Sequence, residues 1–139
     1  MPKKRILFGW GILLLILIAA GWAYYLYNKP RQSAANETTN VTISADSLYS
    51  QYLGNEQACD KKYLGKVIEV TGKIAAIQHS GQSEIWILST SAPNGGGINC
   101  QLFPGEKVEN VKSGDQVTVK GKCTGFLMDV NLADCSVSR

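Results

Sequence analysis

Length, composition and charge exclude several classes of protein. The chain has 139 residues, four cysteines and one histidine, with a formal net charge of +3. This length fits one small domain and excludes a large multidomain enzyme. With 45% hydrophobic and 18% charged residues, the chain is neither disordered nor polybasic. The charge is unevenly divided, because residues 1–35 carry five bases and no acid, whereas the rest carries nine bases and eleven acids.

The N-terminal segment predicts a membrane anchor. Residues 6–27 contain no charge and would span about 33 Å as a helix, enough to cross a bilayer. Aromatic residues stand near both ends of this run, as they do at membrane interfaces: Trp10 at one end and Trp22, Tyr24, Tyr25 and Tyr27 at the other. Because basic residues tend to stay in the cytoplasm, we expect residues 1–5 inside and the C-terminal domain outside. The sequence therefore predicts a single-pass membrane protein.

A cleaved signal peptide is the main alternative. Its apolar core is usually about 7 to 15 residues long and ends at a small-residue cleavage site. The apolar run here is longer, and Ala19-Ala20-Gly21 is followed by bulky aromatic residues. We therefore favour an uncleaved signal anchor, and a buried helix of a soluble protein ranks third. Both leading interpretations place the domain in the cell envelope.

The remaining residues divide into a polar linker and one domain. Residues 28–43 are rich in Asn, Ser, Thr, Gln and Ala and are expected to form a linker, since they could not build a core. The domain is expected at residues 44–139. Ser44 is a candidate N-cap for a helix from about Ala45 to Leu53, and a second helical turn or two should follow over residues 55–63.

Beyond Gly65 the apolar pattern changes to the alternation typical of strands. Five strands are predicted, at residues 67–78, 84–90, 98–102, 116–123 and 130–137. Residues 105–114 should form a loop or one helical turn. In the last strand Val130 and Leu132 share one phase and Cys135 the other, so we expect a bulge near Ala133 or Asp134.

This element order predicts an all-β domain with a short N-terminal helix, preceded by one transmembrane helix. The first strand is long and bendable, and a longer connection joins the third strand to the fourth. A five-stranded Greek-key barrel, the OB-fold, has this arrangement. Closing the barrel removes sheet edges that would otherwise invite aggregation. An SH3-like barrel is the structural alternative.

Several motifs also resemble a known family. They are Ser44-Ala45-Asp46-Ser47-Leu48, Tyr63-Leu64-Gly65-Lys66, residues 114–121 and residues 129–135. This set resembles the bacterial tRNA-anticodon-binding-like OB-fold family, whose members are often described as lipoproteins, over about residues 44–137. The resemblance implies nucleic-acid binding by analogy of fold only, and it brings no catalytic residue. In place of a lipidation cysteine, this chain has its apolar N-terminal segment.

Candidate ligand-binding residues lie on the second and third predicted strands, where OB-folds usually bind. They are Trp86, Asn99, Gln101 and Phe103. The alternative for Trp86, which we favour, is that it packs under the helix or at the barrel rim. Nucleic acid is a disfavoured partner, because residues 36–139 carry nine bases against eleven acids and offer little charge for counterion release.

The cysteines predict a disulfide without predicting a metal site. In an oxidising compartment we expect Cys123 to bridge Cys135 across the last hairpin. The alternative is that all the cysteines are buried thiols that act as small apolar residues. A zinc site is less favoured, because no Cys-x-x-Cys motif exists and the only histidine, His79, is expected in a turn. No metal or cofactor is predicted.

The sequence does not favour an enzyme. It contains no phosphate-binding loop and no dense carboxylate cluster, and a catalytic site would need a deep pocket where His79 meets a carboxylate. We expect a non-catalytic binding or protein-interaction module of the cell envelope, held to the membrane and bound to an envelope protein. The alternative function is binding of an oligonucleotide or an oligosaccharide through Trp86 and the second and third strands.

Overall fold

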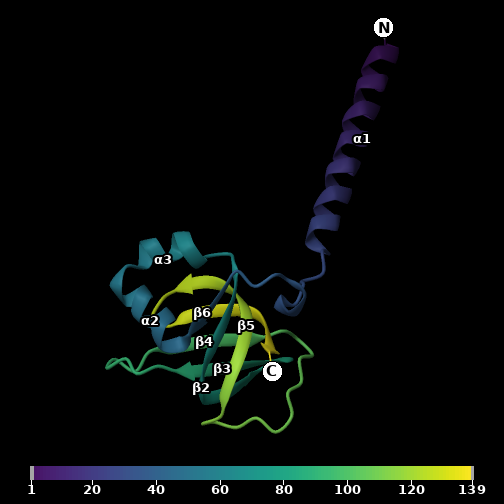
Figure 1. Cartoon of the computed structure of the whole chain (residues 1–139). Helices are drawn as coiled ribbons and strands as arrows, with labels where there is room; N and C mark the ends of the chain where they lie inside the picture. The colour runs from purple at the N-terminus through teal and green to yellow at the C-terminus, as the bar shows by residue number, and fades with distance from the viewer. Residues whose placement is uncertain (1, 139) are drawn as a thin grey trace. The chain divides into compact units, whose positions relative to one another are not determined.

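The computed structural model describes the backbone of residues 2–138 and the side chains of residues 9–138. It divides into two units, residues 1–31 and residues 32–139. The first unit contains the helix α1, Pro2–Tyr27 (Figure 1). Within α1, Gly9–Tyr27 is long and apolar enough to cross a membrane, and its large apolar side chains are exposed. This is the exposure expected of a helix whose apolar surface faces lipid.

The second unit is built on a closed barrel of five strands (Figure 1). Neighbouring strands pair in the order β2, β3, β4, β6, β5, and β5 pairs with β2 to close the ring. The β4–β6 pair is parallel, and the other pairs of the barrel are antiparallel. The strands are β2 (Val67–Ser80), β3 (Ser83–Ser89), β4 (Gly97–Leu102), β5 (Gln116–Phe126) and β6 (Val130–Ser138). This topology confirms the predicted Greek-key OB-fold barrel.

Two irregularities let short strands close into a ring. In β2 the register with β3 shifts between Ile74 and Ala76, and the same strand pairs with β5 through its first half. In β6 the register shifts against both neighbours around Asp134, whose φ is +51°. Such bulges bend a strand and increase its twist. The expected bulge near Ala133 or Asp134 is therefore confirmed, and Cys135 lies buried beyond it.

The segment expected to be a linker is partly built into the domain. A strand, β1 (Val41–Ser44), pairs in parallel with the start of β2. A short 3-10 helix, η1 (Ala34–Asn36), buries Ala34, and Lys120 donates hydrogen bonds to the carbonyl oxygens of Ala35 and Glu37. The prediction of a linker over residues 28–43 is corrected accordingly, because the compact unit begins at Gln32. Four residues of alternating pattern were too short to predict as a strand.

Two helices cover one end of the barrel, as Figure 1 shows: α2 (Ala45–Gly54) and α3 (Glu56–Tyr63). Both begin at capping side chains, as preferred at helix N-termini. The Ser44 Oγ accepts a hydrogen bond from the Ser47 amide at 3.2 Å, and the Asn55 Oδ1 accepts one from the Ala58 amide at 3.0 Å. The predicted N-cap and both predicted helices are confirmed. Their inner faces bury Leu48, Tyr49, Tyr52, Cys59 and Tyr63.

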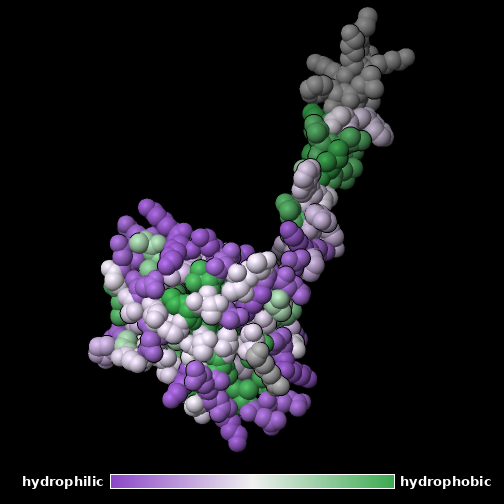
Figure 2. Space-filling view, viewed as in Figure 1, coloured by the Kyte–Doolittle hydropathy of each residue, from purple (hydrophilic) through white to green (hydrophobic). Residues whose placement is uncertain are grey.

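Aromatic rings join the helices to the barrel. The Tyr52 ring stacks on Phe126 of β5 with centroids 5.4 Å apart, and the Tyr49 ring meets the same Phe126 edge-on at 5.8 Å. Farther inside, Trp86 is fully buried opposite Ile77 of β2 and Cys100 of β4. The apolar residues are thus mainly interior, while the visible surface of the domain mixes hydrophilic and hydrophobic residues (Figure 2).

Candidate binding groove

A groove of about 640 Å³ lies against the outward-facing positions of β3, β4 and β6. The end of β5 and one turn of α3 form its other sides. Its lining residues are Asp60, Leu64, Ile85, Asn99, Gln101, Thr124, Gly125, Phe126, Leu127, Asn131, Leu132 and Ala133. The lining combines one carboxylate, several amides and a row of apolar side chains. A mostly apolar concave surface with a few placed polar groups is typical of ligand sites.

The polar part of the groove is held by a small hydrogen-bond network. Asn99 donates from Nδ2 toward Asp129 Oδ2 and Asn131 Oδ1, at 3.4 Å in both cases. Asn131 donates from Nδ2 to the Asp129 carbonyl oxygen at 3.1 Å, and Asp129 Oδ1 accepts the Gly97 amide at 2.7 Å. These contacts fix the orientation of two amide side chains that line the groove. A ligand would therefore meet them already oriented, which reduces the entropy lost on binding.

Asp60 contributes an unusual carboxylate to the groove. It lies in α3, and its Oδ1 atom is buried without a hydrogen-bond partner among the described residues. Burial of a carboxylate oxygen without a partner costs free energy. The fold therefore tolerates an unfavourable group at the edge of the groove.

An apolar rim runs beside this carboxylate. Leu127, at the turn between β5 and β6, is 85% exposed, and Leu64 after α3 is 49% exposed. The two segments meet where Gly125, with φ +119°, turns the end of β5 past the Leu64 side chain. Next to the rim, Met128 is 83% exposed. Large apolar side chains gathered in this way on a surface mark sites of interaction more often than isolated ones do.

The structure brings only part of the predicted ligand-binding set together. Asn99 and Gln101 line the groove, as expected from the outward phase of their strand. Trp86 is fully buried, so its ring cannot stack on a ligand, and Phe103 lies just beyond β4 outside the lining. The favoured alternative for Trp86, packing under the helix or at the barrel rim, requires such burial.

Some groove residues were missed by the sequence analysis. Asn131 shares the outward phase of the last strand, so its alternation with buried Val130 and Leu132 could have identified it. No sequence signal identifies Asp60 or Leu127, because only the packing of α3 beside the β5–β6 turn brings them to this face.

The four cysteines are buried free thiols. The register places Cys123 opposite Leu132, while Cys135 lies against Gly121, two residues farther along β5. Two residues of a strand extend about 6.7 Å, and the distance between strands adds to this offset, so a bridge would require the backbone to move. The expected Cys123–Cys135 disulfide does not fit this structure, whereas the alternative of buried thiols does.

Two of the thiols, Cys135 and Cys123, contact different polar neighbours. Interaction with the neighbouring Cys100 side chain, together with burial, raises the pKa of Cys135 well above its ordinary value. Cys123 lies 3.3 Å from the Tyr52 hydroxyl. Burial is the main cause, and this contact the second, of a raised pKa at Tyr52. Cys135 and Tyr52 thus stay protonated at neutral pH and serve as packing and hydrogen-bonding groups.

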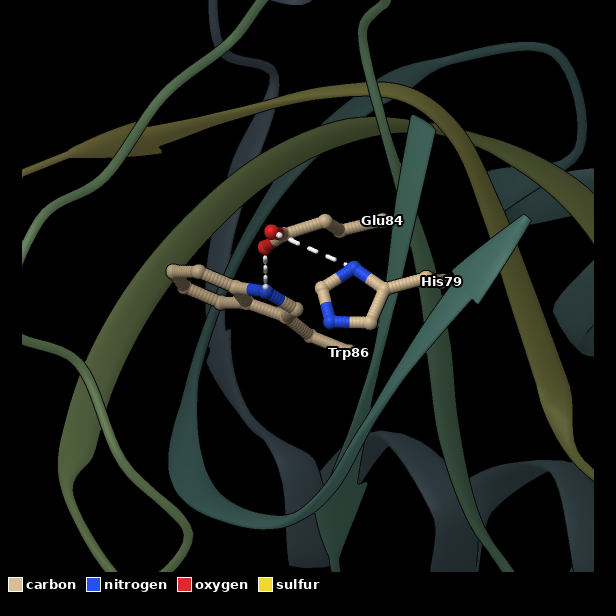
Figure 3. Close-up of polar contacts among 3 residues, drawn as sticks. All are labelled: His79, Glu84 and Trp86. Carbon is tan, nitrogen blue, oxygen red and sulfur yellow. Dashed lines mark hydrogen bonds and ion pairs between the residues drawn. The ribbon is translucent and has the colours of Figure 1, made fainter. Parts of the chain in front are cut away.

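The histidine does meet a carboxylate, but on an exposed hairpin (Figure 3). His79 Nδ1 lies 3.5 Å from Glu84 Oε1, and the Trp86 indole donates to Glu84 Oε2 at 3.0 Å. The His79 side chain is 76% exposed, and neither it nor Glu84 lines the groove described above. An acid–base pair needs a substrate pocket around it, and this pair lies on an exposed hairpin outside the groove.

A family model and one solved structure with a TM-score above 0.5 agree with this architecture. The model of the tRNA_anti-like family matches residues 1–137. A crystal structure of a "putative nucleic acid-binding lipoprotein" from Klebsiella pneumoniae has a TM-score of 0.53 at 20% sequence identity, and the match covers 70% of this chain and 91% of that one. The OBody AM3L09, solved bound to hen egg-white lysozyme, has a TM-score of 0.38 at 16% identity, covering 55% and 84%. No curated protein matches the chain.

Proposed function

The chain belongs to the tRNA_anti-like family, and from this premise we propose that it is a membrane-anchored, extracytoplasmic OB-fold domain that acts as a non-catalytic binding module of the cell envelope. The observation that carries this proposal is the groove of about 640 Å³, with its oriented amides Asn99 and Asn131 and its exposed apolar rim. OB-folds use the corresponding strands for binding. The groove offers contacts for a ligand and no recognisable set of reacting groups.

The membrane part of the proposal is supported by α1. Gly9–Tyr27 is long and apolar enough to cross a bilayer, and three bases precede it at Lys3, Lys4 and Arg5. The excess of positive charge at this end favours a cytoplasmic N-terminus. The domain then follows on the other side of the membrane, attached through the few residues between Tyr27 and Gln32.

Protease protection tests this orientation. The full-length chain, with a C-terminal epitope tag, is expressed in a bacterium, and protease is added to spheroplasts. We expect loss of the tag without lysis of the cells. Replacement of Lys3, Lys4 and Arg5 by Glu should reduce this accessibility, because it removes the charge that sets orientation. A tag protected until the cells are lysed, or a chain recovered without detergent, contradicts the proposal.

Photo-crosslinking tests the binding function at the groove. A crosslinking amino acid at Gln101, an exposed position in the groove, should capture an envelope protein in intact cells. The same amino acid at Glu109, exposed in the loop between β4 and β5, is the matched control and should capture less. Equal capture at both positions, or capture at neither, contradicts a role for this face of the barrel.

Nucleic-acid binding is the second candidate function. It is favoured by the family match and by the name of the Klebsiella protein. Against it, none of the described residues that line the groove is Lys, Arg or His, although phosphate contacts by basic residues supply most of such affinity. Titration of the full chain with a single-stranded oligonucleotide at low salt tests this candidate. Salt-sensitive micromolar binding that is lost in Gln101→Glu would make nucleic-acid binding the leading candidate function.

A further inference from the structure

The groove has the charge of a site for a cation. Among the described residues that line it, Asp60 alone carries a charge. Behind the amides, the Asp129 carboxylate orients Asn99 and adds a second negative charge near the groove. A carboxylate that lacks donors is stabilised most by an ammonium or guanidinium group. A phosphate would instead be repelled.

The other lining groups suit a polypeptide better than a base or a sugar. Stacking platforms for bases are exposed aromatic rings, but Phe126 is the one aromatic residue in the lining, and its ring is stacked on Tyr52. Gln101 offers both donors and an acceptor, and the Asn99 Oδ1 atom and one Asn131 Nδ2 hydrogen stay free beside the internal bonds. These groups match the amide and carbonyl groups of an extended backbone. Leu64 and Leu127 leave apolar surface uncovered next to these amides.

We propose that this groove binds an extended basic segment of a partner protein, with a lysine or arginine of that segment paired with Asp60 and its apolar side chains on Leu64 and Leu127. This inference rests on the proposed binding function and specifies its ligand. The partner side chain pairs with the part of the Asp60 carboxylate that faces the groove, since the Oδ1 atom itself is buried. The amides bond the peptide backbone, and the exposed leucines are covered when the complex forms.

A peptide titration tests the proposal with the full chain in neutral phosphatidylcholine nanodiscs. The probe is a fluorescent, end-capped hexapeptide of alternating Leu and Arg, and its partner probe has Glu in place of Arg. We expect the Arg peptide to bind and the Glu peptide to fail. Asp60→Asn should weaken binding by about tenfold or more, the range for losing a charged hydrogen-bonded pair. Glu109→Gln, a carboxylate in the β4–β5 loop, is the matched control and should change nothing.

A variant of Lys122 tests whether the ligand is positively or negatively charged. It is exposed on β5 and pairs with Ala133, which lines the groove. Lys122→Glu should therefore strengthen binding of the Arg peptide and weaken binding of any phosphate-bearing ligand. Each variant is compared with the parent by its thermal unfolding, so that a loss of binding is not mistaken for a loss of fold.

Three other ligands are titrated beside the peptide: a single-stranded oligonucleotide, an N-acetylglucosamine hexamer and vesicles with anionic lipid. The proposal is overturned when the Arg peptide binds equally to the parent and to Asp60→Asn. It is also overturned when Asp60→Asn and Lys122→Glu change the affinity for one of these other ligands but not for the Arg peptide. Capture at Gln101 in the crosslinking experiment together with failure of the Arg peptide would leave the binding function standing and remove this ligand class. Failure of both experiments would remove the binding function itself.

Discussion

The tyrosine hydroxyls of the core and the Asp60 carboxylate of the groove differ in how they are paired. At the edge of the core, the buried Tyr49 side chain donates from Oη to the Met128 carbonyl oxygen at 3.1 Å and accepts from Asn94 at 2.9 Å. The Tyr63 hydroxyl donates to Gln51 at 2.8 Å. In the groove, an Asp60 oxygen is buried without a partner. Paired groups stabilise the fold, whereas a buried carboxylate oxygen without a partner costs stability.

The largest expected effect comes from Trp86, which belongs wholly to the interior. Trp86→Ala should lower the free energy of unfolding by about 4 kcal/mol, because it empties a fully buried site in the core. Urea denaturation of the full chain in detergent measures this loss. Trp86→Phe should recover part of it.

The same variant separates the two regions. Under conditions where Trp86→Ala remains folded, its affinity for the Arg peptide should equal that of the parent, because Trp86 does not line the groove. A stable Trp86→Ala protein with lost binding would show that the indole is a ligand contact.

Gly96→Ala is the next strongest way to disturb the interior. A Cβ atom at this position would overlap Tyr49 Oη, so the ring must move and lose its bonds to Asn94 and Met128. We expect a loss of about 2 kcal/mol in the free energy of unfolding. The same change at Gly54, where no atom lies within 4 Å, is the control and should have little effect. In a Tyr49→Ala background the cost of Gly96→Ala should largely disappear.

Alkaline pH should weaken the interior through Cys135. Its pKa is raised in the folded state by Cys100 and by burial above the ordinary value of 9.0. Above that pH the unfolded chain loses a thiol proton that the folded chain keeps. Stability is therefore fully present below pH 9 and falls above it, by about 1.4 kcal/mol per pH unit for one thiol. Urea midpoints measured from pH 7 to pH 10 test this, and Cys135→Ala should flatten the slope rather than steepen it.

The smallest expected effect is a gain in stability at the groove. Asp60→Asn replaces a charged group that lacks a hydrogen-bond partner, so the free energy of unfolding should rise by about 1 kcal/mol. The thermal midpoint of the full chain measures this change. A fall in stability would mean that the carboxylate supports the fold, and the contrast between interior and groove would then fail at this residue.

The fold could be predicted from the sequence because its strands alternate and its turns carry glycine and proline. The run from Gln116 to Cys123 shows this alternation, and the change of phase between Leu132 and Cys135 located the bulge at Asp134. The strand β1 was missed, since its pairing with β2 joins residues 41–44 to residues 68–71 without a local signal.

The groove was less predictable, because its residues come from four strands and one helix. Alternation placed Asn99 and Gln101 on the outer face, and the same reasoning applies to Asn131. Trp86 was named as a candidate ligand contact, although it lies on the same side of its strand as buried Leu88. Asp60 reaches the groove only because of the way α3 packs against the barrel. This packing has no local signal in the sequence, such as alternation or a capping motif.

The attachment of η1 and β1 also has a mechanical consequence. A force applied to the chain before Gln32 would first load the hydrogen bonds from Lys120 to the carbonyl oxygens of Ala35 and Glu37. It would then load the four paired residues of β1. The ring itself is closed independently by the pairing of β2 with β5. The pairing that closes the ring therefore does not depend on η1 or β1, so tension would break the contacts of this N-terminal segment before those of the ring.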